Sequence, residues 1–209
     1  MKNILLIGDS ISLDYGRYLE GFTGPDLHVY GKPGREAAYE NLDIPVGGNG
    51  GDSRMVLEHL RELGDSPVLN CDLFVFNCGL HDVKRSRQTD ELQVPPEEYV
   101  QNLHAIIDLM RAKRKPVVFL TSTPTATERY GAIRSFYRLT EDVPAYNLLA
   151  KGVMAERGVP ILDLYAFTVA LGLEGDDLFR DHTHFTEPVM RLHGAFVAGW
   201  LNAYFSALS

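Results

Sequence analysis

Two short segments of the sequence carry residue types that could perform nucleophilic catalysis, and the first lies near the N-terminus. Gly8-Asp9-Ser10 directly follows the apolar run 3–7. A serine at the point where a strand turns into a helix exposes its hydroxyl at the carboxyl edge of the sheet. Its backbone N–H would lie at a helix N-terminus, which favours negative charge. The tripeptide alone is a weak signal, because Asp9 or Ser10 could equally cap the helix.

The second segment is Asp181-His182-Thr183-His184, which precedes the last helical stretch of the chain. An aspartate and a histidine three residues apart in a loop can approach each other. The carboxylate then binds one imidazole nitrogen and leaves the other to face a nucleophile. A histidine-rich surface tract or a metal site would explain the same residues, so the segment alone leaves these alternatives open.

Five short apolar runs predict the strands that would position these segments. Runs such as Leu73–Phe76 lack polar alternation, which is typical of strands buried on both faces of a parallel sheet. The predicted strands are Asn3–Ile7, Leu27–Tyr30, Asp72–Asn77, Pro116–Thr121 and Pro160–Leu164. Helical spacing of apolar residues predicts helices over Arg54–Leu63, Glu97–Arg114, Pro144–Arg157 and Pro188–Leu208. This alternation predicts an α/β fold, a parallel sheet between two helical layers.

Two of the predicted connections are long, namely 84–96 and 122–142. Both follow strands, so we expect them at the carboxyl edge of the sheet, where open α/β folds bind ligands. The second contains several aromatic and basic residues, among them Tyr130 and Arg138. Such a mixture could form a lid or an acyl pocket, or it could be a solvated loop.

Composition excludes several classes of function. The chain has 209 residues and a formal net charge of -8, which gives no electrostatic footprint for nucleic acid and disfavours an anionic membrane surface. Its two cysteines, Cys71 and Cys78, predict buried free thiols, with no disulfide framework and no zinc site. No stretch approaches the roughly 20 apolar residues of a membrane helix, and residues 1–8 lack the long apolar region of a signal peptide. We therefore expect a cytoplasmic protein without membrane insertion.

Taken in order, these segments resemble the conserved blocks of the SGNH (GDSL-type) hydrolases. Gly8-Asp9-Ser10 matches the first block, Gly51-Asp52-Ser53 the second, and Asp181-x-x-His184 the last. The resemblance spans almost the whole chain and implies one SGNH hydrolase domain over residues 1–209. It also implies a flavodoxin-like three-layer α/β/α sandwich with a five-stranded parallel sheet, and activity on small esters or related acyl compounds.

The third block departs from the family pattern. The sequence reads Cys78-Gly79-Leu80-His81-Asp82, with His81 at the position of the family asparagine that donates to the oxyanion. A neutral imidazole still carries one N–H donor, so His81 can meet the same requirement. Its reach and angle differ from those of an amide, and a titrating donor would add a pH dependence. The alternative is that His81 only packs or orders its loop.

The resemblance implies a specific assignment of roles. Ser10 is the expected nucleophile, His184 the general base and Asp181 the residue that orients it. The expected oxyanion donors are the backbone N–H groups of Ser10 and Gly51 and the side chain of His81. This mechanism needs no metal and no organic cofactor, and the expected partner is a small-molecule ester. The sequence does not indicate the acyl or alcohol group, nor the oligomeric state.

Two other functions fit parts of the sequence. A metal-dependent phosphoesterase could use carboxylates and imidazoles at strand ends as ligands. The residues available for that purpose are Asp9, Asp82, His182 and His184. A catalytically quiet binding module would keep the pocket without turnover, with His81 as the sign of lost activity.

Overall fold

A five-stranded parallel sheet forms the centre of the molecule. The computed structural model describes residues 1–131 and 135–208 of the 209-residue chain. Strand order is β2-β1-β3-β5-β7, and every neighbouring pair is parallel. The strands are β1 (Lys2–Ile7), β2 (Leu27–Gly31), β3 (Leu73–Phe76), β5 (Val117–Leu120) and β7 (Ile161–Leu162). The sheet predicted from the five apolar runs is therefore confirmed.

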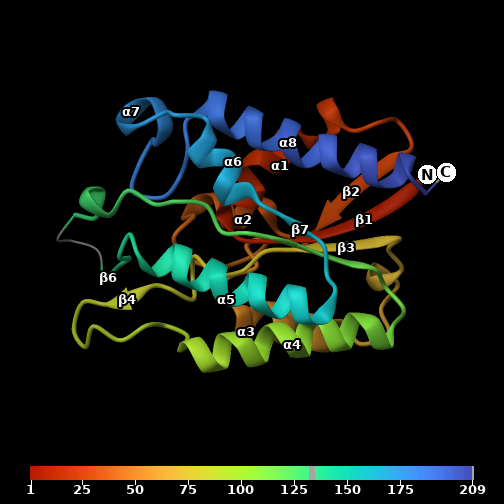
Figure 1. The fold of residues 1–209 in the computed structure, drawn as a ribbon, viewed down its shortest axis with the longest axis horizontal. Helices are drawn as coiled ribbons and strands as arrows, with labels where there is room; N and C mark the ends of the chain where they lie inside the picture. The colour runs from red at the N-terminus through yellow and green to blue at the C-terminus, as the bar shows by residue number, and fades with distance from the viewer. Residues whose placement is uncertain (132–134, 209) are drawn as a thin grey trace.

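Helices cover both faces of this sheet, as the unbroken apolar strands predict. Figure 1 shows α1 (Ser10–Phe22) and α8 (Glu187–Ser206) on one face. The other face carries α3 (Ser53–Leu63), α4 (Pro96–Ala112) and α5 (Asp142–Arg157). The sequence did not predict the shorter helices α2 (Arg35–Glu40), α6 (Leu164–Ala170) and α7 (Gly175–Leu178), nor the 3-10 turns Pro67–Leu69 and Thr127–Arg129. The three-layer α/β/α architecture is thus the observed one.

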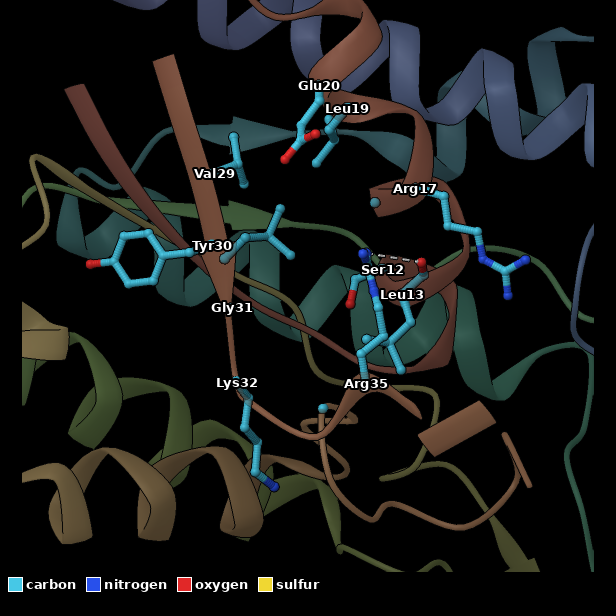
Figure 2. Close-up of a pocket in the computed structure, with 13 residues that line it drawn as sticks. Ser12, Leu13, Arg17, Leu19, Glu20, Val29, Tyr30, Gly31, Lys32 and Arg35 are labelled. Atoms are coloured by element: carbon cyan, nitrogen blue, oxygen red, sulfur yellow. Dashed lines mark hydrogen bonds between the residues drawn. The ribbon is translucent and has the colours of Figure 1, made fainter. Parts of the chain in front are cut away.

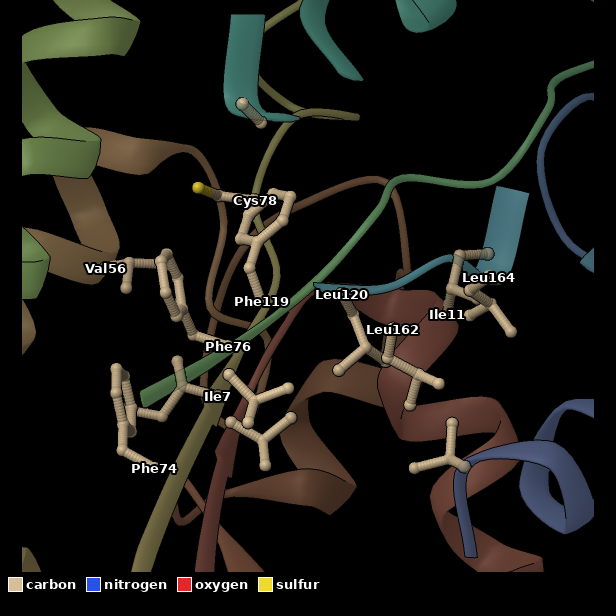
Figure 3. Close-up of a cluster of buried hydrophobic side chains, with 14 of the residues drawn as sticks. Ile7, Ile11, Val56, Phe74, Phe76, Cys78, Phe119, Leu120, Leu162 and Leu164 are labelled. Atoms are coloured by element: carbon tan, nitrogen blue, oxygen red, sulfur yellow. The ribbon is translucent and has the colours of Figure 1, made fainter. Parts of the chain in front are cut away.

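The central strands bury their side chains on both faces of the sheet. All four residues of β3 and all four of β5 are buried. Phe76 stacks on Phe74 with ring centroids 5.4 Å apart and meets Phe119 edge-on at 5.1 Å. Figure 3 shows these rings on one side of the sheet and Leu120 with Ile11 of α1 on the other. This packing fixes the strand ends from which the functional segments emerge.

The two long connections are not wholly irregular, and in this respect the prediction of two loops was wrong. Residues Arg85–Ser86 form β4 and Phe136–Tyr137 form β6, which pair antiparallel. Figure 1 shows them beyond the sheet, at the end opposite the N-terminus. Neither strand lies in an apolar run like the one that indicated β7, so the sequence pattern did not reveal them. Their pairing joins the two connections into one structural unit at the carboxyl edge.

The strand order reverses direction between β1 and β3. The chain moves outward from β1 to the edge strand β2, then returns to β3 on the other side of β1. Ile7 pairs with Phe76, and the Asn77 N–H donates to the Ile7 carbonyl at 2.9 Å. Ligands of open α/β sheets bind at such a switch point. The segments after β1 and β3 therefore lie together where a ligand site is expected.

Among the helices that the structure describes, none is long and apolar enough to cross a membrane.

Candidate functional site

Ser10 is the first residue of α1, directly beyond the end of β1. Asp9 caps this helix, since its Oδ1 accepts the Ile11 N–H at 3.0 Å. At the first helical position the Ser10 N–H has no acceptor within the helix. Only 3% of the Ser10 surface is exposed. The turn thus places one hydroxyl and one free backbone donor at the carboxyl edge of the sheet.

Ser10, His184 and Asp181 lie in one hydrogen-bonded line. The Ser10 Oγ is 2.9 Å from His184 Nε2, and His184 Nδ1 is 2.8 Å from Asp181 Oδ2. Because an ionised carboxylate can only accept, Nδ1 carries the proton and Nε2 is left to accept from the Ser10 hydroxyl. This is the tautomer that a general base needs. The structure therefore brings together three residues that are separated by up to 174 positions in the sequence.

The loop that carries His184 is held from two sides. Asp181 Oδ1 accepts the backbone N–H groups of Thr183 and His184, each at 2.8 Å. Burial raises the pKa of Asp181, but the hydrogen bonds and charge of His184 outweigh it and hold this pKa well below its usual range. Arg180 binds the buried carboxylate of Asp14 on α1 at 2.8 Å. The loop is thereby fixed to the helix that begins at Ser10.

The glycine-rich loop, residues 47–51, contacts the Ser10 turn through its backbone. Gly50 N–H donates to the Gly8 carbonyl at 2.8 Å, and a Cβ on Gly50 would lie 2.9 Å from that oxygen. Such a close approach requires a glycine. The Gly51 N–H, an expected oxyanion donor, is directed at Asn49 Oδ1, 3.0 Å away. In this arrangement the Gly51 amide already has an acceptor, which differs from the expectation.

His81 lies five residues beyond the end of β3, in the turn beside the Ser10 segment. It is 2% exposed, and its buried Nδ1 has no hydrogen-bond partner. Burial, followed by the charges of Lys84 and Arg138, lowers the pKa of His81 well below its ordinary value. This shift favours the neutral imidazole, which carries a single N–H donor. A buried polar atom without a partner calls for an explanation, and a ligand group is one.

Asp82, next to His81, binds the first residue of α3, just after the glycine-rich loop. Its two carboxylate oxygens accept the Ser53 N–H at 3.0 and 3.1 Å. Asp52 caps α3 by accepting the Met55 N–H at 3.0 Å. Burial raises the pKa of Asp82 to about 7, although the Ser53 hydrogen bonds oppose the shift. Asp82, like Asp9, thus holds a turn in place.

This raised pKa predicts a pH-dependent contribution to stability. A carboxyl group whose pKa is higher in the folded state stabilises the fold below its unfolded pKa, and loses that stabilisation as pH rises through the folded value. The window for Asp82 runs from about pH 4 to about pH 7. Wild type should therefore lose more unfolding free energy than Asp82→Asn between pH 5 and pH 8, since asparagine cannot ionise. Urea unfolding of both at each pH measures this, and an identical pH dependence would contradict it.

The four residues proposed as possible metal ligands each have protein partners, and both His182 and His184 lie near Asp181, at 3.6 and 2.8 Å. His182 Nε2 lies 3.0 Å from Asp43 Oδ1, whereas His184 lies between Asp181 and Ser10. Asp9 and Asp82 are each bound to backbone N–H groups. Within residues 1–131 and 135–208, no three histidine, cysteine, aspartate or glutamate side chains are arranged to hold a metal. In the part of the chain that the structure describes, these four residues therefore do not form a common ligand set.

Asp43 makes two contacts near the site that no sequence motif indicated. Its backbone carbonyl accepts from Lys84 Nζ at 2.6 Å, while its side chain binds His182. Burial lowers the pKa of Lys84 to about 7. No local motif marks Asp43, because its partners come from loops 41 and 139 residues away. Asp43 thereby connects the segment that precedes residues 47–51 with the loop that carries His184.

One cavity of the described structure lies away from these residues. It has a volume of about 280 Å³ and is bounded by α1, β2 and the segment after β2, with none of Ser10, His81, Asp181 or His184 in its wall. Figure 2 shows the charged ends of Arg17 and Lys32 pointing away from its centre. This cavity therefore does not coincide with the hydrogen-bonded residues beyond β1 and β3.

Comparison with known families finds one match that covers most of the chain. The family model described as GDSL-like lipase/acylhydrolase matches residues 6–192. That range contains all four of Ser10, His81, Asp181 and His184. A search of curated protein sequences finds no match.

Solved structures share this fold at low sequence identity. A lipase/acylhydrolase from Enterococcus faecalis has a TM-score of 0.70 and 18% identity, covering 98% of this chain and 97% of its own. An acetyl xylan esterase gives a TM-score of 0.67 and 15% identity, with 95% and 98% covered. The aryl esterase of M. smegmatis with a bound inhibitor gives 0.64 and 15%, with 97% and 99% covered. At these identities the likeness establishes the fold.

Proposed function

Because this chain belongs to the GDSL-like lipase/acylhydrolase family and is therefore a hydrolase, we propose that it cleaves a small carboxylic ester through an acyl-enzyme on Ser10. The observation that carries the proposal is the line of hydrogen bonds from Ser10 through His184 to Asp181. That order of hydroxyl, imidazole and carboxylate is the constellation of a serine hydrolase. Acyl and acetyl esters are the substrates that we propose.

Each proton in this reaction has a defined path. The Ser10 Oγ attacks the ester carbonyl carbon while His184 Nε2 takes the hydroxyl proton. The tetrahedral intermediate collapses as His184 returns that proton to the leaving alcohol, which forms the acyl-enzyme. A water molecule then gives a proton to His184 and attacks the acyl carbon, and the acid leaves as Ser10 is re-protonated. Asp181 stabilises the imidazolium at both stages.

Negative charge on the carbonyl oxygen needs donors aimed at it. We assign this role to the Ser10 backbone N–H, which has no acceptor in its helix, and to the His81 side chain, whose Nδ1 has no partner. The Gly51 N–H is the third candidate, but it would first have to leave Asn49 Oδ1. His81 thus takes the place of the asparagine that the family pattern expects.

Turnover of p-nitrophenyl acetate by the purified chain, with and without EDTA, tests the proposed function. We expect turnover that EDTA leaves unchanged and that prior treatment with a fluorophosphonate abolishes. Loss of activity in EDTA and recovery with a divalent metal would support a metal-dependent enzyme. A folded protein that binds esters but neither turns them over nor reacts with the fluorophosphonate would support a binding module.

Removing His81 should separate the oxyanion role from a packing role. His81→Ala is expected to lower kcat by about a hundredfold or more, the usual effect of losing one oxyanion donor. Steady-state kinetics with p-nitrophenyl acetate measures it. His81→Asn is the matched variant, since it restores an amide donor and should recover most of the loss. A kcat for His81→Ala within about threefold of wild type would remove His81 from this role.

A further inference from the structure

Arg138 is a buried arginine that lies between the two loops of the proposed site. It follows β6 directly and is only 2% exposed. Arginine is rarely so fully buried unless its guanidinium has partners. The contacts of this guanidinium therefore indicate what it does.

Its hydrogen bonds reach both loops at once. Arg138 Nε donates to the Leu80 carbonyl at 2.5 Å, and Nη1 donates to Thr183 Oγ1 at 2.9 Å. Leu80 immediately precedes His81, and Thr183 immediately precedes His184. Nη1 also donates to the Tyr130 hydroxyl, which is itself 2.9 Å from Thr183 Oγ1. One planar side chain thus fixes the residue before the proposed oxyanion donor and the residue before the proposed base.

The partners of Arg138 are all uncharged. They are the Leu80 carbonyl and the hydroxyl oxygens of Tyr130 and Thr183. The contacts therefore give Arg138 no ion pair to maintain, and their fixed fork geometry is what a lysine could not reproduce. Its charge also acts on the site, because it adds to the burial that lowers the pKa of His81 and opposes the burial that raises the pKa of Asp9.

We propose that Arg138 is a positioning residue, which sets the spacing between the His81 loop and the His184 loop so that the donor reaches the carbonyl oxygen while the base reaches the Ser10 hydroxyl. The inference rests on the proposed function. Misplacement of catalytic groups by about 1 Å costs on the order of a hundredfold in rate. The loss should therefore fall on kcat, while KM for a small ester changes little.

Kinetics of Arg138→Met and Arg138→Lys on p-nitrophenyl acetate test this proposal. Both variants should lose about ten- to a hundredfold in kcat with KM within about threefold, because lysine keeps the charge but not the fork. Among the hydrogen bonds of Arg138, Thr183→Val removes only the one from Nη1 to Thr183 Oγ1, and kcat should therefore fall by less. If Arg138→Met does not fold, Arg138→Lys and Thr183→Val still decide the question.

A matched control separates positioning from stability. Arg85 binds Asp142 through two hydrogen bonds of 2.6 and 3.0 Å and also joins separate segments, but it contacts none of the proposed catalytic residues. Arg85→Met should lower Tm while keeping kcat within about threefold of wild type. The proposal is overturned if Arg138→Lys keeps the wild-type kcat, or if the Arg138 and Arg85 variants lose kcat in proportion to Tm. Wild type that fails to react with a fluorophosphonate would instead overturn the proposed function itself.

Discussion

Replacing Ser10 by alanine is expected to lower kcat for p-nitrophenyl acetate by at least about ten-thousandfold, because no acyl-enzyme can form without its hydroxyl. The fold should tolerate the change, since the Ser10 Oγ has its hydrogen bond to His184 and the helix is capped by Asp9. KM should change little for a small ester. Steady-state kinetics and thermal unfolding of the variant measure both expectations.

Ser12→Ala is the matched control for this experiment. Ser12 lies on the same helix and is also buried, but its hydroxyl donates to the Asp9 carbonyl at 2.6 Å. It should keep kcat within about threefold of wild type. Equal losses in the two variants would mean that the helix start, rather than the Ser10 hydroxyl, supports turnover.

Removing the imidazole of His184 is expected to cost between about ten-thousand- and a millionfold in kcat, because base and nucleophile act as a unit. His184 Nε2 accepts from Ser10, whereas the neighbouring His182 binds Asp43. His184→Ala and His182→Ala therefore compare two imidazoles of one loop that both lie near Asp181 but whose Nε2 atoms have different partners. We expect His182→Ala to lose less than about tenfold in kcat, because this change alters only the position of the loop that carries His184.

Single-turnover kinetics of both variants with p-nitrophenyl acetate measure the acylation step itself. Comparable losses in the two variants, with unchanged Tm, would contradict the assignment of His184 as base. A large loss in His184→Ala alone would support it.

The sequence predicted the architecture because strand and helix signals in this chain are local. The run Leu73–Phe76 has no polar residue, and Pro95–Glu98 gives α4 a start with proline and acidic groups. The short helices escaped prediction because they have about two turns or fewer, and β4 and β6 did so because neither lies in an apolar run like those that indicated the five sheet strands. They form through tertiary contacts, which a local pattern does not contain.

The same distinction separates the predictable part of the site from the rest. Ser10, Asp181 and His184 are conspicuous in the sequence because each belongs to a short motif at a strand end or before a helix. The Gly51 amide was expected to face the oxyanion, but the neighbouring Asn49 side chain competes for its proton. Asp43 and Arg138 bind residues 139 and 45 positions away, so their roles depend on the fold alone.

Intact-mass spectrometry after treatment with a fluorophosphonate tests the central claim, that Ser10 is the nucleophile of an ester hydrolase, most directly. Wild type should gain the mass of a single adduct, peptide mapping should place it on Ser10, and Ser10→Ala should gain none. An adduct of the same extent on folded Ser10→Ala, or no adduct on folded wild type, would contradict the account.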